Sequence, residues 1–142
     1  MRRGKARGIV LVLAGFLLTT VAGGCGNTGS VQTKTVSSAS GYSITLVANP
    51  NAVPGNGPGS VIMATVRNQS GQLVNGLTVQ FGTNLGVFPD AEGKEFLNMF
   101  AVTSNGVATA GLRAPKGVTI VGTAEVFAQV EDAVSMTRVT FF

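Results

Sequence analysis

Short runs in which apolar and polar residues alternate dominate the chain from Tyr42 onward, and they constrain the fold more than any other feature. The clearest run covers 77–83, where Leu77, Val79 and Phe81 share one face. Because successive side chains of a strand point to opposite faces of a sheet, this alternation is typical of a strand with one buried face. No window shows the apolar spacing that an amphipathic helix requires. The sequence therefore predicts an all-β domain.

Turn-forming residues separate these runs. Asn-Gly pairs, and a loop over 50–59 that is rich in Pro and Gly, suit tight turns and interrupt strands. The expected strands cover 42–49, 60–67, 77–83, 96–103, 107–114, 118–130 and 133–142. About seven short strands of this kind indicate an antiparallel β-sandwich. An up-and-down barrel is the alternative, but the uneven connection lengths favour a sandwich with crossing connections.

The first 24 residues have the layout of an export signal. Four basic residues precede an apolar run over 9–21, which is too short to cross a hydrocarbon core that needs about 20 apolar residues. Small residues at 22–24 then lead to Cys25, the only cysteine of the chain. The segment resembles a bacterial lipoprotein signal, which implies cleavage before Cys25 and lipidation of that residue. Ala22 stands where a lipobox usually has a larger aliphatic residue, so release by the ordinary signal peptidase is the alternative.

Residues 25–41 are expected to form the lipidated cysteine and a flexible linker, because they are rich in Ser, Thr and Gly and lack an apolar period. A first strand through 31–36 is the alternative for this segment. Several acyl chains hold a protein durably at a bilayer, so the resemblance implies a membrane anchor. Gly26 stands where aspartate would favour retention at the inner membrane. We therefore expect the outer membrane, on its periplasmic or its surface face.

The formal net charge of +4 comes from the leader. Beyond it, six basic residues face six acidic ones, and they are scattered along the chain. A nucleic-acid-binding domain would show a basic stripe. We therefore expect no nucleic-acid partner.

Residues 60–81 resemble the core motif of the invasin/intimin-type bacterial immunoglobulin-like domain, group 1. The matching positions are Ala64, Val66, Asn68, Gly71, Val74, Gly76, Val79 and Phe81. Further matches follow at Gly86, Phe88, Thr103, Gly106, Ala108, Leu112, Gly122, Ala124, Val126, Ala128, Val139 and Phe141. The resemblance implies an immunoglobulin-like sandwich over 42–142. Domains of that family act as spacers or adhesive modules at bacterial surfaces, commonly in tandem, whereas this chain has one copy and no terminal receptor-binding domain.

The residues that usually carry catalysis are scarce. The chain has no histidine, which excludes a Ser-His-Asp triad, and the assignment of Cys25 to the leader junction leaves no thiol for a nucleophile or a zinc site. Asp90, Glu92 and Glu95 could form a carboxylate pair or a calcium site, the latter with 131–132 only if those loops meet. We expect a solvated loop there instead, and hence no enzyme, cofactor or metal.

Two further features have competing interpretations. The repeated glycines of 55–59 are expected to form a loop and not a phosphate cradle, because they neither follow a strand nor open a helix. Phe88, Phe96 and Phe100 are expected in the core, with an apolar patch for a protein partner as the alternative. The chain has no Trp, and Tyr42 is its only Tyr, so few side chains are available to stack on a sugar.

The sequence thus predicts a non-enzymatic, lipid-anchored immunoglobulin-like module of the bacterial cell envelope. Its expected role is adhesion, envelope structure or protein assembly. Its expected partners are the membrane, through lipidated Cys25, and an unknown envelope or surface protein, with no small-molecule substrate identified. A small ligand-binding module for a glycan or calcium is the alternative.

Overall fold

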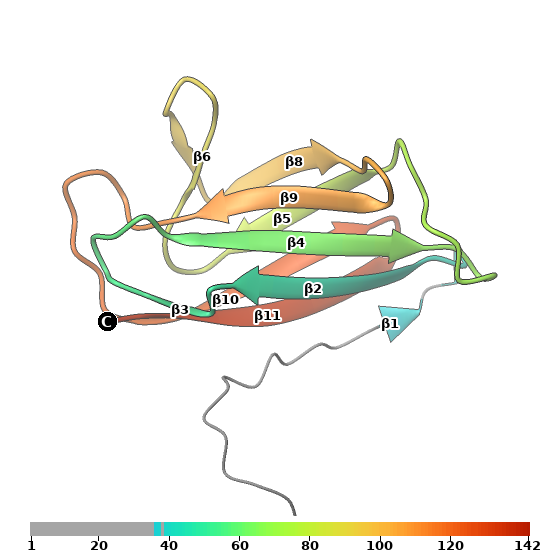
Figure 1. The fold of residues 1–142 in the computed structure, drawn as a ribbon, viewed down its shortest axis with the longest axis horizontal. Helices are drawn as coiled ribbons and strands as arrows, with labels where there is room; N and C mark the ends of the chain where they lie inside the picture. The colour runs from blue at the N-terminus through green and yellow to red at the C-terminus, as the bar shows by residue number, and fades with distance from the viewer. Residues whose placement is uncertain (1–35, 38) are drawn as a thin grey trace, which may run out of the picture.

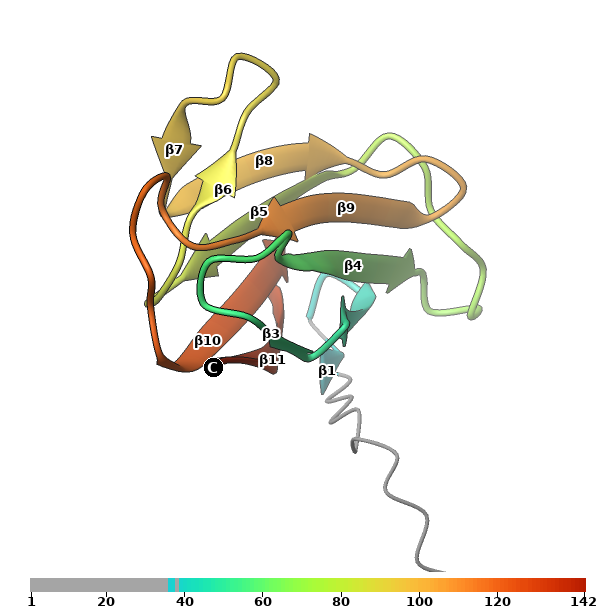
Figure 2. The ribbon, with the colours of Figure 1, turned by 60° about the vertical axis from the view of Figure 1, so that its left-hand side comes forward.

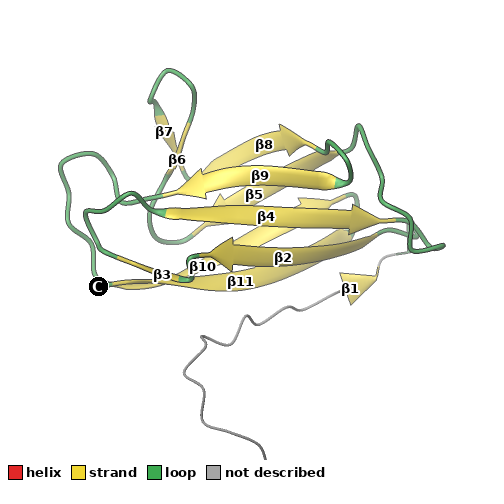
Figure 3. Ribbon diagram, in the orientation of Figure 1, coloured by secondary structure: helices red, strands yellow, loops and turns green. Residues whose placement is uncertain are grey.

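The computed structural model describes residues 36, 37 and 39–142. The predicted signal peptide, Cys25 and most of the predicted linker lie outside the described residues. The described residues form strands and no helix, as Figure 3 shows. The strands are β1 (Val36–Ser37), β2 (Ser43–Asn49), β3 (Ala52–Val53), β4 (Ser60–Arg67), β5 (Thr78–Thr83), β6 (Phe88–Pro89), β7 (Glu95–Phe96), β8 (Asn98–Val102), β9 (Val107–Leu112), β10 (Gly122–Val130) and β11 (Ala133–Phe141).

Two sheets pack face to face (Figure 1). The first has the order β1-β2-β4-β9, and the second has the order β3-β11-β10-β5-β8. Neighbouring strands are antiparallel except β3 and β11, which are parallel. A separate two-stranded hairpin, β6–β7, projects from one end of the sandwich (Figure 2). The predicted all-β sandwich is confirmed.

The connections between the sheets are those of an immunoglobulin-like sandwich. The chain passes from β2 in the first sheet to β3 beside β11 in the second, and it crosses again after β3, β4, β8 and β9. Strands β2, β4 and β9 correspond to A, B and E, and β5, β8, β10 and β11 correspond to C, C′, F and G. The crossing connections distinguish the fold from the up-and-down barrel.

The core lies between the sheets and consists of the inward residues of each alternating strand. β11, for example, alternates strictly between buried and exposed positions along its length. The predicted inward residues that are fully or almost fully buried are Ile44, Leu46, Ile62, Ala64, Val66, Val79, Phe81, Ala108, Ala110, Leu112, Ala124, Val126, Ala128, Val139 and Phe141. Tyr42 and Leu77, also predicted to face inward, are partly buried against this core.

Three predicted elements differ from the observed ones. The run 118–130 becomes a strand only at Gly122, because the preceding residues turn and Ile120 donates its amide to Gly55 O at 3.0 Å. The run 96–103 is divided between β7 and β8 by the exposed Leu97. The loop 50–59 contains the short strand β3, which pairs with the end of β11.

The two ends of the sandwich differ in what they carry (Figure 1). At the entry end, β1 pairs with the start of β2, so the folded chain already begins within the predicted linker. The β10–β11 turn, with Glu131 and Asp132, also lies at this end. At the hairpin end lie the β6–β7 hairpin and Phe142. The nine residues of β10 separate the two ends by about 30 Å, at about 3.3 Å per residue.

Candidate functional site

The hairpin loop uses one of the candidate carboxylates to hold its own shape. Asp90 Oδ1 accepts the amide of Glu92 at 3.1 Å and that of Lys94 at 2.7 Å. The carbonyl of Asp90 also accepts the amide of Gly93 at 3.0 Å. This is the Asx-type turn that an aspartate commonly forms with amides following it. Asp90 therefore serves the loop as an acceptor of backbone hydrogen bonds.

Glu95 fastens the base of the hairpin to the β9–β10 connection. Its Oε1 lies 3.0 Å from Arg113 Nη2 and accepts the amide of Lys116 at 2.8 Å. Both side chains of the ion pair are only about a quarter exposed, at 26% for Glu95 and 28% for Arg113. The carboxylate is thus committed to two protein partners, which supports a structural role. Glu92, the third candidate, is exposed.

The other acidic pair lies at the entry end and binds the beginning of the folded chain. A carboxylate oxygen of Asp132 accepts the amide of Ala39 at 2.8 Å and that of Ser40 at 3.3 Å, and the Ser40 hydroxyl donates to the same side chain. Because the hairpin and the β10–β11 turn lie at opposite ends, the two acidic loops do not meet. Within residues 36–37 and 39–142, no group of three or more metal-ligating side chains could hold a metal ion.

The three undecided phenylalanines occupy three different environments. Phe88 is fully buried, with its ring centroid 6.4 Å from that of Phe81. Phe96 is half-buried, and Lys94 Nζ lies 5.1 Å from the centroid of its ring. Phe100 is 65% exposed. The prediction of core positions is therefore right for Phe88 and wrong for Phe100, which belongs instead to an exposed surface.

An apolar hollow, here called the β8 notch, separates the hairpin from the first half of β8. Its volume is about 370 Å³. Its lining residues are Phe88, Pro89, Asp90, Phe96, Asn98, Met99 and Phe100. The one carboxylate among them is Asp90, which is already bonded to its own loop. The notch therefore suits an apolar group.

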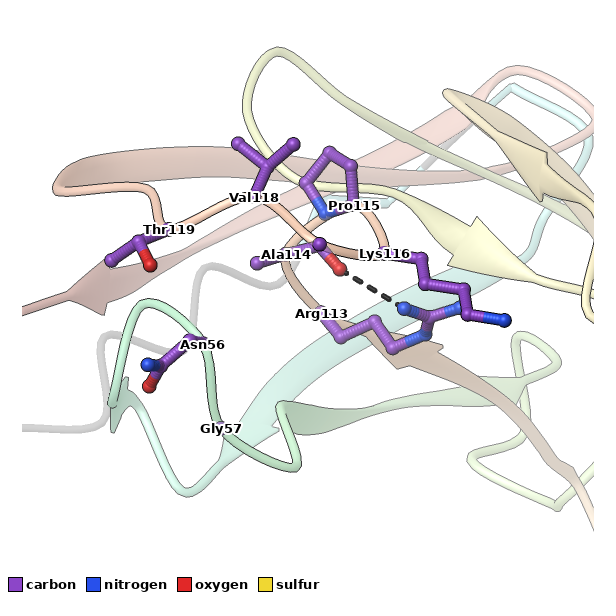
Figure 4. Close-up of a pocket in the computed structure, with 9 residues that line it drawn as sticks. Asn56, Gly57, Arg113, Ala114, Pro115, Lys116, Val118 and Thr119 are labelled. Atoms are coloured by element: carbon purple, nitrogen blue, oxygen red, sulfur yellow. Dashed lines mark hydrogen bonds between the residues drawn. The ribbon is translucent and has the colours of Figure 1, made fainter.

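A second hollow of about 400 Å³ lies between the glycine-rich loop and the β9–β10 connection (Figure 4). Asn56, Gly57 and residues 113–119 line it. Arg113 points across one side, but its guanidinium donates to Ala114 O at 3.1 Å and pairs with Glu95.

The glycine-rich loop uses its amides internally. Gly55 donates to Phe142 O at 2.7 Å, and Gly57 donates to Pro54 O at 3.0 Å. A phosphate cradle requires amides that are free to point at an anion. These two amides are engaged, in agreement with the predicted loop.

The outer face of the second sheet carries an apolar surface that includes Phe100, for which the sequence analysis gave an apolar patch as the alternative to the core. Val102 is 60% exposed beside Phe100 on β8, and Met136 on β11 is 47% exposed. Between them, the ring of Phe127 lies against Gly82, where an added Cβ would come within 2.0 Å of Phe127 Cζ. The signal was present in β8, because residues 99–102 are all apolar and therefore occupy both faces of the strand, including the outer face.

No protein-family model and no curated protein matches the chain. Among the described residues, none belongs to a helix long and apolar enough to span a membrane. The fold and its surfaces are therefore the basis on which function is inferred.

Proposed function

We propose that the protein is a non-enzymatic, lipid-anchored immunoglobulin-like module of the bacterial cell envelope, with a role in adhesion, envelope structure or protein assembly. In this proposal, acylated Cys25 fixes the location, and the sandwich presents its far end to a partner protein. The observation that carries the proposal is that the two ends of the domain differ. The chain enters at one end, and the β6–β7 hairpin lies at the other (Figure 1), where it lines the β8 notch.

The attachment at the entry end supports this orientation. Val36 pairs with Ile44 in the β1–β2 ladder, and Asp132 binds the amides of Ala39 and Ser40. These bonds hold the incoming chain against the domain. A tether attached here directs the entry end toward the membrane and places the hairpin about 30 Å farther away, from about 3.3 Å per strand residue.

The state of the ionisable groups supports a binding role over catalysis. The chain has no histidine. Asp90 accepts two backbone hydrogen bonds, and Glu95 accepts one and forms an ion pair with Arg113. A general acid or base needs a proton-transfer position that is open to substrate. The hairpin instead offers an apolar notch, which suits contact with another protein surface.

The test is membrane attachment of the full chain with and without Cys25. We expect the native chain to sediment with membranes and to incorporate a labelled fatty acid. Cys25→Ser removes the acylated residue, so it should lose both properties while the domain stays folded by circular dichroism. A native chain that is released without fatty acid would contradict the proposal and favour the ordinary signal peptidase. A rise in melting temperature with calcium or a sugar would favour the alternative ligand-binding function.

A further inference from the structure

Strand β8 is an edge strand without the usual protection against pairing. It is last in the order of the second sheet, with β5 as its neighbour. Natural edge strands commonly carry a lysine, a proline or a bulge that prevents another strand from adding. β8 reads Asn-Met-Phe-Ala-Val and has no charged residue and no proline. Its exposed side chains include Phe100 and Val102, whereas the edge strand β9 of the first sheet exposes Thr109 and Gly111.

The hydrogen bonds that flank β8 show which of its backbone groups face outward. Thr83 donates to Leu97 O at 3.0 Å, and Thr103 donates to Leu77 O at 2.8 Å. In an antiparallel ladder, such bonded pairs recur at every second residue. The odd-numbered residues of β8 therefore bond to β5. The amides and carbonyls of Asn98, Phe100 and Val102 point to the open edge.

We propose that two copies of this chain pair through β8, in the antiparallel sense, about a two-fold axis at Phe100. The two five-stranded sheets then join into one continuous sheet. Phe100 of each copy lies opposite Phe100 of the other, and Asn98 lies opposite Val102. Three outward-facing residues on each strand exchange about six backbone hydrogen bonds across the axis.

The chemistry of the edge favours a second copy as the occupant. An antiparallel strand pair about a two-fold axis is its own complement, because each copy offers the same donors and acceptors. No residue from Leu97 to Ser104 carries a charge, so two copies meet without electrostatic repulsion. Phe100, the more exposed of the two large apolar side chains on the open face, lies at the centre of the strand, where pairing buries it against its equivalent.

The β8 notch adds a second point of complementarity. Asn98 lines the notch, and pairing places Val102 of the other copy opposite it. An exposed valine is thereby brought beside an apolar hollow on each side of the axis. Strand addition of this kind takes its affinity from main-chain hydrogen bonds and its specificity from side-chain pockets.

The inference deepens the proposed assembly role and rests on it for its setting, but the pairing itself requires only the folded domain. It can therefore be tested in the full chain carrying Cys25→Ser, in which an introduced thiol is the only one. Phe100→Cys places two thiols opposite each other. Directly opposed residues lie about 5.5 Å apart between Cα atoms, within the range of a disulfide.

Val102→Cys is the matched control, because it lies on the same strand and face and is almost equally exposed. Its own equivalent would be four residues away along the ladder, about 14 Å at about 3.4 Å per residue, which is too far for a disulfide. Under mild oxidation we expect the Phe100→Cys chain to form covalent dimers at least tenfold faster. A mixture of Asn98→Cys and Val102→Cys chains should crosslink, whereas each alone should not.

Sedimentation equilibrium gives an independent measurement on the chain with its native strand. We expect a dimer that Phe100→Lys weakens at least tenfold and that Val121→Lys, at a 77% exposed position outside β8, leaves unchanged. The pairing would be overturned if the chain with native β8 sedimented as a monomer. It would also be overturned if Phe100→Cys and Val102→Cys crosslinked equally fast. Loss of fatty-acid labelling in the native chain would instead overturn the anchor and leave these results untouched.

Discussion

We expect the buried side chain of Phe88 to hold the β6–β7 hairpin against the core. Its side chain is fully buried and packs against Phe81, although the backbone around it belongs to a hairpin that projects from the sandwich. Phe88→Ala removes the ring and leaves a cavity beneath the hairpin. We expect a large loss of stability together with local opening of the loop over 90–94.

The expected loss of folding stability in Phe88→Ala follows from the burial of the ring. Truncation of a buried phenylalanine to alanine costs about 3–5 kcal/mol, of which the contact with Phe81 accounts for about 0.5–1.5 kcal/mol. Phe96 and Met99 are only partly buried around the β8 notch and can move into the space. We therefore expect about 3–4 kcal/mol, which most domains survive, since their stability is about 5–15 kcal/mol.

Urea unfolding measures this change at a concentration where the chains are monomeric. With a slope of about 1.5 kcal/mol per molar urea, a loss of 3 kcal/mol lowers the midpoint by about 2 M. Phe142→Ala is the matched control, because the same atoms are removed from a side chain that is 68% exposed. We expect it to cost less than about 1 kcal/mol. Equal midpoints for the two variants would refute the role of Phe88 as the anchor of the hairpin.

Two further substitutions test other contacts. Asp132→Ala should lower the free energy of unfolding by about 1–2 kcal/mol and speed hydrogen exchange at the amides of Ala39 and Ser40, because it removes their acceptor. Glu131→Gln is the control, and unchanged exchange in Asp132→Ala would argue against this attachment of the incoming chain. Gly82→Ala should cost about 1–3 kcal/mol, because its Cβ would meet the ring of Phe127. In a Phe127→Ala background that cost should fall below about 1 kcal/mol, and an unchanged cost in this double-mutant cycle would show that the ring is not the obstacle.

The strands were predictable where local pattern and burial agree. The expected strand 60–67 coincides with β4, because its inner positions are apolar and turn residues flank it. The expected start at 118 was too early. Val118 and Val121 are apolar but exposed, and this segment is fixed by the bond between Ile120 and Gly55, which no local pattern reveals.

The candidate site was predictable only where its contacts join residues that are close in sequence. A solvated hairpin loop around Asp90 follows from nearby residues, since its partners Glu92 and Lys94 are close in sequence. The bond between Glu95 and Arg113 joins residues that the fold alone brings together. A core position was preferred for Phe100 over the alternative of an exposed patch, because an aromatic residue in an apolar strand is usually buried. Only the sheet order shows that β8 is an edge.

The parallel pairing of β3 with β11 has a mechanical consequence. Bonds from Thr140 to Asn51, from Phe142 to Val53 and from Gly55 to Phe142 join the first part of the domain to its last strand. Tension applied between the entry end and Phe142 runs along these strands and loads all three bonds in shear, so they must rupture together instead of unzipping singly. The sandwich is thereby built to resist stretching along its long axis.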